Sequence, residues 1–313
     1  MLSVIIPAYN EEPMIKKTVV TISSLLQKEK IPYELLFVDD GSTDKTWDII
    51  SSISANDSNV KGVSFSRNFG KESAIFAGLS SGAGDCFVVI DCDLQHPPHK
   101  IVEMYRLWEQ GYEVIEGIKT NRGKESAAHS FAAKSFYKII SSATGINMEN
   151  ASDFKLLDRK AVTVLLNMKE KRAFFRALSS WIGFKTTSVE FEVQSREIGE
   201  TKWSTKSLIK YAISNITSFT TAPIQIVSIF GFITFFVGLV FSIITIIQKI
   251  RGTALGGFST LIILNFFTSS IVMISLGIIG YYISRIYEEV KGRPRYIIGQ
   301  TANLNDQVNL NDK

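Results

Sequence analysis

The chain has 313 residues, of which 45% are hydrophobic, and a formal net charge of +4. This length is enough for one large domain with an appendage. The modest positive charge, without a basic stripe of interleaved aromatic residues, argues against nucleic acid as a partner and suits anionic membrane headgroups.

Helices and strands are predicted to alternate through the first 120 residues. Helical spacing of apolar residues predicts helices at 12–27, 44–53 and 72–79. Short apolar runs predict strands at 2–6, in the first part of 33–44, and at 60–66, 87–90 and 113–119. This alternation is typical of an α/β domain with a mostly parallel sheet, in which ligands bind beyond the carboxyl ends of the strands.

The next part of the chain carries weaker patterns. Residues 123–144 have helical spacing, and 154–157 and 187–193 are predicted strands. Residues 201–221 form a predicted amphipathic helix, with apolar residues at helical spacing over 204–219. Its position directly before a long apolar segment favours a helix that lies on a membrane surface, although an ordinary surface helix fits the periodicity equally well.

Two long apolar segments follow. Residues 224–247 and 258–284 contain no charged residue, and each exceeds the roughly 20 residues that a helix needs to cross a bilayer. Because they are close in the chain, they predict a hairpin of two transmembrane helices within 222–285. The flanks carry more Lys and Arg than the hairpin loop, so the positive-inside rule places residues 1–222 and the tail, 286–313, in the cytoplasm of a multi-pass membrane protein.

The ends of the chain and the cysteines add three expectations. The N-terminal segment MLSVIIPAYN has no basic region before its apolar run, so it is not expected to be a signal peptide. The polar, Asn-rich end after Gly299 is expected to be disordered. Cys86 and Cys92 lie at opposite ends of one predicted strand, too far apart to form a disulfide with each other, which fits a reducing cytosol.

Acidic and polar residues follow three of the predicted strands. Tyr9 and Glu11 follow the first strand, Asp39–Asp40 end the second, and Asp91 and Asp93 follow the fourth. Neighbouring carboxylates repel each other, and a divalent cation such as Mg²⁺ removes that cost while it binds substrate phosphates. If the strand geometry continues past the acids, Asp91 and Asp93 face one ion. A solvated turn is the simpler alternative.

Six motifs in order carry a family resemblance: VIIPAYNEE, FVDDGSTD, SRNFGKESA, DCDLQHPP, SDFKLLDR and REIGETKW. Together with the hairpin, they resemble the inverting glycosyltransferases of family 2. The most similar group is the polyprenyl-phosphate glycosyltransferases, such as bacterial bactoprenol-phosphate sugar transferases and dolichol-phosphate mannose synthase. The resemblance extends from Leu2 to about Arg295. It implies a GT-A fold, Rossmann-like with a mostly parallel sheet, in residues 1–200, with a UDP-sugar donor and Mg²⁺ or Mn²⁺.

The resemblance also implies roles for individual residues. Asp153 would act in catalysis together with Asp93, either as a base or as a group that orients the sugar; a structural cap is the alternative for Asp153. The implied metal ligands are Asp91, Asp93 and Gln95. The residues expected to bind the nucleotide sugar are Pro7, Tyr9, Glu11, Asp39, Asp40 and Lys71. Those expected to bind the lipid phosphate are Arg122, Arg196 and Lys202.

Departures from the family pattern concern the acceptor side of the site. Lys119 and Lys155 stand where the family often has Arg, and the family often has an acid near His96. Lys119 is still expected to assist in binding phosphate. His96, His99 and His129 are not at a zinc-binding spacing and are expected on the surface or behind the metal ligands.

The implied function is inverting transfer of a hexose, glucose or N-acetylglucosamine, from a UDP-sugar to undecaprenyl phosphate for bacterial cell-envelope glycosylation. A homo-oligomer such as a tetramer is expected. One alternative is another lipid acceptor such as diacylglycerol, and another is processive polymer synthesis, although the sequence has no Gln-x-x-Arg-Trp motif. The third alternative is a non-catalytic membrane partner that keeps the fold.

Overall fold

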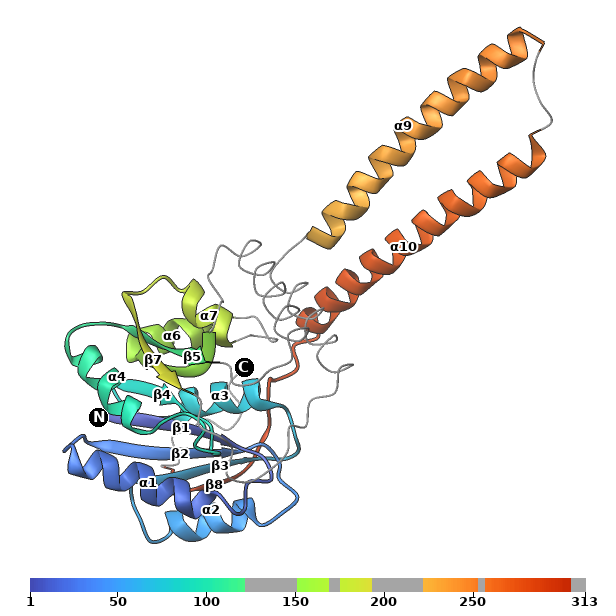
Figure 1. Cartoon of the computed structure of the whole chain (residues 1–313). Helices are drawn as coiled ribbons and strands as arrows, with labels where there is room; N and C mark the ends of the chain where they lie inside the picture. Colours follow the sequence, from blue (N-terminus) through green and yellow to red (C-terminus); the bar gives the residue numbers. More distant parts are fainter. Residues whose placement is uncertain (122–150, 169–174, 193–221, 253–256, 305–313) are drawn as a thin grey trace. The chain divides into compact units, whose positions relative to one another are not determined.

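The computed structural model describes residues 1–121, 151–168, 175–192, 222–252 and 257–304 (Figure 1). Contacts divide the chain into two units, Met1–Ser204 with Pro294–Lys313, and Thr205–Arg293. Each unit is described by itself. The helices predicted at 123–144 and 201–221 lie outside the described residues.

A mixed eight-stranded sheet forms the centre of the first unit (Figure 1). Its strands, in spatial order, are β7 (Thr186–Glu192), β5 (Val114–Asn121), β6 (Ala151–Asp158), β4 (Cys86–Val89), β1 (Leu2–Ala8), β2 (Tyr33–Asp39), β3 (Val60–Phe65) and β8 (Ile298–Ala302). The strands β4, β1, β2 and β3 run parallel to one another, and β5 runs parallel to β7. β6 and β8 run antiparallel to their neighbours, and the other six strands share one direction. The sheet is therefore mixed but mostly parallel, as the sequence predicts.

Three helices cover one face of the sheet. They are α1 (Ile15–Lys28), α2 (Thr46–Ser54) and α4 (His99–Glu109). In α1 the buried residues Ile15, Val19, Ile22 and Leu26 recur at helical spacing, which turns one apolar stripe toward the sheet. These residues share a core cluster with Val4 and Ile6 of β1, and with apolar residues of α2 and α4.

The opposite face is covered by α3 (Lys71–Ser81), which contacts β1 and β2. Gly78 of this helix lies against Ile5 and Val38, which alternate with the residues that face α1. The helices α6 (Arg159–Asn167) and α7 (Phe175–Trp181) contact β6. Because helices cover both faces, the central strands are apolar almost throughout, and this explains why their sequences are continuous apolar runs.

The last strand of the sheet comes from the C-terminal part of the chain. β8 pairs antiparallel with β3, so the expectation of disorder after Gly299 is wrong for residues 300–302. The ring of Tyr296 stacks on Phe65 with centroids 5.0 Å apart, and its hydroxyl lies 2.9 Å from Ser80 Oγ. The first unit therefore includes chain on both sides of the helical hairpin, and not only residues 1–200. Residues 305–313 lie outside the described residues.

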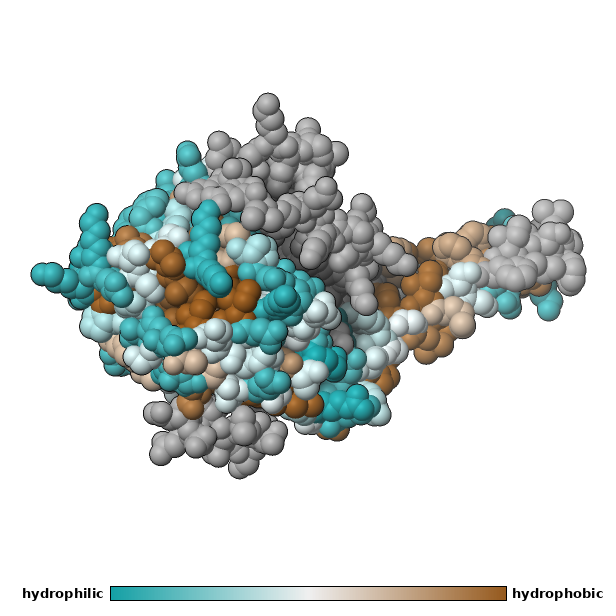
Figure 2. All heavy atoms as spheres, turned by 90° about the horizontal axis from the view of Figure 1, so that it is seen from below, coloured by the Kyte–Doolittle hydropathy of each residue, from teal (hydrophilic) through white to brown (hydrophobic). Residues whose placement is uncertain are grey.

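The second unit contains two long helices in contact with each other, α9 (Ala222–Ile250) and α10 (Phe258–Val290). Within them, Ile229–Ile250 and Phe267–Val290 are long and apolar enough to cross a membrane, by length and composition. Most of the apolar side chains that the structure describes in these helices are exposed, and Figure 2 shows this apolar surface along the helices. α10 extends beyond residue 285, where the sequence predicts that the second span ends.

Candidate active site

A cavity of about 170 Å³ lies at the carboxyl ends of β1, β2 and β4. The strands bring their last residues to one edge because they are parallel, with Ala8 opposite Asp39 and Ile5 opposite Val89. The cavity is lined by Pro7, Ala8, Tyr9, Glu11, Asp40, Lys71, Ala74, Asp91, Cys92 and Asp93. Most of the residues predicted to bind the nucleotide sugar are therefore gathered here, beside two of the predicted metal ligands.

The loop after β1 is hydrogen-bonded to the loop after β2 and to the first residue of α2. The N–H of Asn10 donates to Ser42 Oγ at 2.9 Å, and the N–H of Glu11 donates to Thr46 Oγ1 at 2.9 Å. Tyr9, which precedes these two anchored residues, lines the cavity and is 42% exposed. Its ring is thus accessible to a ligand that enters the cavity.

The two acids at the end of β2 have different surroundings. Asp39 is 1% exposed and its carboxylate accepts a hydrogen bond from Ser64 Oγ at 2.7 Å. It does not line the cavity, so the structure does not bring it to the predicted nucleotide site. Asp40 lines the cavity and accepts from the N–H groups of Phe69 at 2.7 Å and Gly70 at 3.0 Å. Burial raises the pKa of Asp40 above its ordinary value, and these hydrogen bonds offset part of that rise.

Gly41 fixes the close approach of the loops around Asp40. It has φ of +67°, and a Cβ at this position would lie 2.4 Å from the carbonyl carbon of Arg67. A side chain would therefore be strained by its backbone conformation and would also collide with backbone. Glycine lets the chain turn directly after Asp40 and keeps the Asp40 carboxylate against the loop that precedes α3.

Asp91 and Asp93 both line the cavity, although the strand geometry does not continue to them. β4 ends at Val89 and the chain turns, with Leu94 at φ of +55°. The N–H of Gln95 donates to Asp93 Oδ1 at 3.1 Å, but Gln95 is not among the residues that line the cavity. A turn, rather than strand alternation, thus brings the two carboxylates to one cavity.

The two carboxylates suit a hard divalent cation. Mg²⁺ prefers oxygen ligands and is commonly held by one or two carboxylates, with water and substrate phosphates completing its shell. In the described parts of the chain, no group of three or more His, Cys, Asp or Glu side chains could hold an ion by itself. Asp91 and Asp93 therefore fit a cation that binds together with a phosphorylated substrate.

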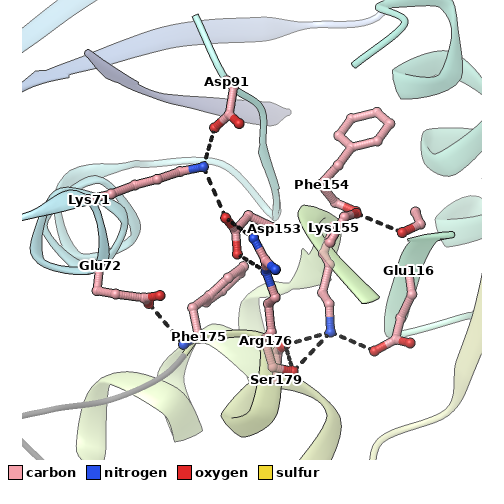
Figure 3. A network of polar contacts seen from close by, with 12 residues as sticks. Lys71, Glu72, Asp91, Glu116, Asp153, Phe154, Lys155, Phe175, Arg176 and Ser179 are labelled. Carbon is pink, nitrogen blue, oxygen red and sulfur yellow. Dashed lines mark hydrogen bonds and ion pairs between the residues drawn. The ribbon is translucent and has the colours of Figure 1, made fainter. Parts of the chain in front are cut away.

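A polar network beside the cavity joins α3, β6 and α7 (Figure 3). Lys71 Nζ lies 2.5 Å from Asp91 Oδ1 and 2.9 Å from Asp153 Oδ2. Arg176 donates to both oxygens of Asp153, from Nε at 2.6 Å and from Nη2 at 2.9 Å. The carboxylate predicted to act in catalysis, Asp153, is therefore held by two cations from different helices.

The charges around Asp153 determine its protonation. Asp153 is 5% exposed, and burial by itself would raise the pKa of its carboxyl group. The positive charges of Arg176 and Lys71 outweigh burial and hold the pKa of Asp153 well below its ordinary value. Because a strongly ionised carboxylate is a weak proton acceptor near neutral pH, the geometry favours an orienting or electrostatic role over that of a general base.

Glu72 is a member of this network that the sequence motifs did not assign a role. Its Oε2 accepts the N–H of Phe175 at 2.9 Å, at the start of the helix that carries Arg176. Burial and the charge of Asp153 raise the pKa of Glu72 to about 7. Glu72 and Phe175 are 103 residues apart in the chain, so the sequence pattern contains no local signal of this contact.

Lys155 supports α7 from the sheet. Its Nζ lies 2.6 Å from Glu116 Oε1 on β5 and donates to Ser179 Oγ at 2.9 Å on α7 (Figure 3). The side chain of Lys155 is fully buried, and burial lowers its pKa, which the charge of Glu116 partly offsets. Lys155 thus fixes the helix that carries Arg176, and its amine is enclosed by protein groups.

Two further basic residues lie close to the network. Burial and the charge of Arg176 lower the pKa of Lys119, whereas the charges of Asp153 and Asp91 oppose the change. His96 is buried rather than on the surface, and its ring stacks on Phe154 with centroids 5.0 Å apart. Its Nδ1 accepts the N–H of Asp91 at 3.4 Å, so it lies directly behind a predicted metal ligand. The predicted phosphate-binding residues Arg122, Arg196 and Lys202 lie outside the described residues.

The fold and the site define an α/β protein with carboxylates gathered at the carboxyl ends of parallel strands. The sequence profile of the family described as Glycosyl transferase family 2 matches residues 3–165, more than half of the chain. This chain belongs to glycosyltransferase family 2 and is a glycosyltransferase with the GT-A fold. The resemblance identified in the sequence is thereby confirmed.

Similar proteins match along almost the whole chain. An uncharacterized glycosyltransferase of Bacillus subtilis is 39% identical over 97% of this chain and 95% of its own length. A prophage bactoprenol glucosyl transferase homolog of Escherichia coli is 34% identical, with coverage of 95% and 98%. A bactoprenol glucosyl transferase of Shigella phage SfII is 32% identical, with coverage of 95% and 97%.

Among solved structures, glucosyl-3-phosphoglycerate synthase from Mycobacterium tuberculosis, in complex with Mn²⁺, UDP-glucose and phosphoglyceric acid, also matches. The match covers 70% of this chain and 79% of that chain, at 20% sequence identity and a TM-score of 0.49. It is too distant to assign a substrate or a metal to this chain.

Proposed function

We propose that this enzyme transfers a hexose, glucose or N-acetylglucosamine, from a UDP-sugar to undecaprenyl phosphate with the help of Mg²⁺ or Mn²⁺. The observation that carries the proposal is that Asp91 and Asp93 share one cavity with Tyr9 and Asp40. Relatives named as bactoprenol glucosyl transferases, which match along nearly their whole length, support a polyprenyl phosphate as the acceptor.

The groups around the cavity suit the parts of a UDP-sugar. The exposed ring of Tyr9 offers a face on which uracil can stack. Asp40 presents a carboxylate that can accept from the uracil N–H or from ribose hydroxyls. A divalent cation at Asp91 and Asp93 would offset the charge of the diphosphate and favour its departure as UDP.

The acceptor explains why a strong base is unnecessary. A polyprenyl monophosphate is already an anion near pH 7, since its second pKa is about 6. One of its oxygens attacks the anomeric carbon, and the bond from that carbon to the UDP oxygen breaks on the opposite face, so the configuration inverts. Asp153, kept ionised by Arg176 and Lys71, is available to orient the sugar during this displacement.

The helices α9 and α10 suit an enzyme whose acceptor stays in a membrane. We propose that both cross the bilayer and that the first unit, which holds the active site and is called the catalytic unit below, lies on the cytoplasmic side, where the lipid phosphate is exposed at the interface. Lys and Arg residues that flank the hairpin, including Lys291, Arg293 and Arg295, support this orientation. A homo-oligomer such as a tetramer stays a prediction from the family resemblance.

The test is release of UDP by the full-length protein with three acceptors. UDP-glucose and UDP-N-acetylglucosamine are each supplied with undecaprenyl phosphate, with diacylglycerol, or without a lipid. We expect UDP release with at least one donor only when undecaprenyl phosphate and a divalent cation are both present. Release with diacylglycerol alone would replace the proposed acceptor, and no lipid-dependent release with any donor would favour a non-catalytic membrane partner.

A further inference from the structure

Lys71 lies between Asp91, a predicted metal ligand, and Asp153, the carboxylate predicted to act in catalysis. Its ammonium group lies 2.5 Å from Asp91 Oδ1 and 2.9 Å from Asp153 Oδ2 (Figure 3). The side chain of Lys71 is 42% exposed and it lines the cavity, so its amine can move without opening the core of the domain. Lys71 is also the first residue of α3, and Gly70 before it has φ of +97°, which ends the preceding loop at the cavity.

The contact with Asp91 conflicts with the proposed metal site. An ammonium group and a divalent cation repel each other strongly when both lie against one carboxylate. Asp91 is one of the two carboxylates that we propose for the metal, and one of its oxygens is already paired with Lys71. Binding of the cation therefore requires that Lys71 move away from Asp91 Oδ1.

Asp153 is arranged so that this movement does not leave it unpaired. Arg176 bonds to both of its oxygens, and so it neutralises Asp153 independently of Lys71. Asp91, in contrast, has Lys71 as the one cation within 3 Å among the described residues. The pairing of Lys71 with Asp91 is thus the one that a metal would replace.

We propose that Lys71 is an internal counter-ion for Asp91 that exchanges with the divalent cation and thereby weakens metal binding in the absence of substrate. This inference rests on the proposed metal site. After the exchange, the ammonium group remains beside the cavity, where it can contact the phosphates of the donor. Lys71 is therefore a positioning residue that links the arrival of the metal to the binding of the nucleotide sugar.

The inference differs from a role for Lys71 as a substrate ligand alone. A substrate ligand would affect binding of the nucleotide sugar but would leave the affinity for metal unchanged when no nucleotide is present. A counter-ion must change the metal affinity itself. The measurement is therefore a titration of the full-length protein with Mn²⁺ in the absence of nucleotide. Electron paramagnetic resonance reports the concentration of free Mn²⁺ at each step of the titration.

Removal of the charge should strengthen metal binding. We expect Lys71→Met and Lys71→Gln each to lower the Kd for Mn²⁺ by about tenfold, because the competing charge is lost. Lys71→Arg, which keeps the charge, should stay within about twofold of the wild type. Lys160→Met, at an exposed lysine of α6, is the matched control for net charge and should also stay within about twofold.

Unchanged or weaker Mn²⁺ binding in both neutral variants would overturn the inference, provided that their thermal unfolding matches that of the wild type. Asp91→Asn separates this failure from failure of the metal site. If Asp91→Asn binds Mn²⁺ as the wild type does, the proposed metal site is wrong. If Asp91→Asn loses Mn²⁺ but the neutral Lys71 variants are unchanged, only the role of Lys71 is wrong.

Discussion

The ion pair between Asp153 and Arg176 is a largely buried charged contact beside the cavity. Its two hydrogen bonds orient the carboxylate and, with Lys71, keep it ionised. The pair therefore sets both the position and the charge of Asp153. A change at Arg176 is expected to alter both properties, whereas the cavity residues stay in place.

We predict that Arg176→Met lowers kcat/KM for sugar transfer by about tenfold or more and makes the enzyme more sensitive to acid. Removal of the guanidinium raises the pKa of Asp153, so its carboxylate becomes protonated at a higher pH than in the wild type. The measurement is kcat/KM against pH. Arg176→Lys, which keeps a cation, should show a smaller acid shift, and identical acid limbs in Arg176→Met and the wild type would contradict the assignment.

Glu72 should make stability depend on pH in the opposite sense to an ordinary paired carboxylate. Burial raises its pKa to about 7 in the folded protein, from an ordinary value of 4.5. The folded state therefore favours protonated Glu72, and this contribution is complete below pH 4.5 and is lost as pH rises through 7. At pH 8 the buried charge costs stability.

The expected result is that Glu72→Gln unfolds at a higher temperature than the wild type at pH 8, with the difference shrinking toward pH 5. Gln keeps an oxygen that can accept the N–H of Phe175. Thermal unfolding at several pH values measures this difference. Glu103→Gln, at an exposed carboxylate of α4, serves as the control. A constant difference across this range would show that Glu72 does not titrate with folding.

At the scale of elements, α3 connects the core of the sheet to the cavity. Its first residues are Lys71 and Glu72, and its middle packs tightly against β1 at Gly78. A Cβ at Gly78 would lie 2.2 Å from Ile5 Cγ2. The helix must therefore shift if a side chain is added, and its first turn would shift with it.

We predict that Gly78→Ala destabilises the catalytic unit by about 1–3 kcal/mol through overpacking. The sign of the change in unfolding free energy is informative, because Ala in an unconstrained helix stabilises by about 1 kcal/mol relative to Gly. Denaturant unfolding measures the change. In a protein that already carries Ile5→Ala, the added methyl group has space, so the same substitution should cost less. A stabilising effect of Gly78→Ala in the wild type would contradict the tight packing.

After α10 the chain returns to the sheet, and this return is a second feature at the scale of elements. Tyr296 stacks on Phe65 and contacts Ser80, directly before β8 pairs with β3. We expect Tyr296→Ala to cost about 1–3 kcal/mol of unfolding free energy, and Tyr296→Phe much less because it keeps the stacked ring. Equal losses in the two variants would assign the effect to the hydroxyl group rather than to the ring.

Sequence patterns could predict the strands that are buried on both faces, since these read as apolar runs. β8 was not predictable in this way because it is a short edge strand with exposed residues such as Gln300 and Thr301, and its place depends on its pairing with β3. The strand positions also predicted which edge of the sheet carries the site. The antiparallel insertion of β6 between β4 and β5 depends on long-range pairing and leaves no local pattern.

Within the site, the motifs indicated the residues that line the cavity but not those that support it. Arg176 is 23 residues from Asp153 and outside every motif, so only the tertiary structure brings them together. Asp39 and Asp40 are adjacent and chemically identical, yet only Asp40 lines the cavity. Asp91 and Asp93 face the same cavity because of a turn at Leu94, which the alternation of a strand did not predict.

At the scale of the whole molecule, the proposed topology places the hairpin loop on the outer side of the membrane. Gln248 lies near the end of α9, and Ser52 lies on α2 of the catalytic unit; both are exposed. The native Cys86 and Cys92 are buried, so they should give little background to a thiol reagent. We predict that a membrane-impermeant maleimide labels Gln248→Cys in intact cells, and labels Ser52→Cys only after the membrane is opened. The reverse pattern would invert the topology.

The central claim is that Asp91 and Asp93 hold the cation that makes sugar transfer to a lipid phosphate possible. The most direct measurement is formation of the lipid-linked sugar from a UDP-sugar and undecaprenyl phosphate by the wild type, Asp91→Asn and Asp93→Asn, each with Mg²⁺, with Mn²⁺ or with a chelator. We predict product only from the wild type with a divalent cation, and a loss of at least about a hundredfold in either variant. Full activity of the wild type in the chelator, or of either variant, would contradict the claim.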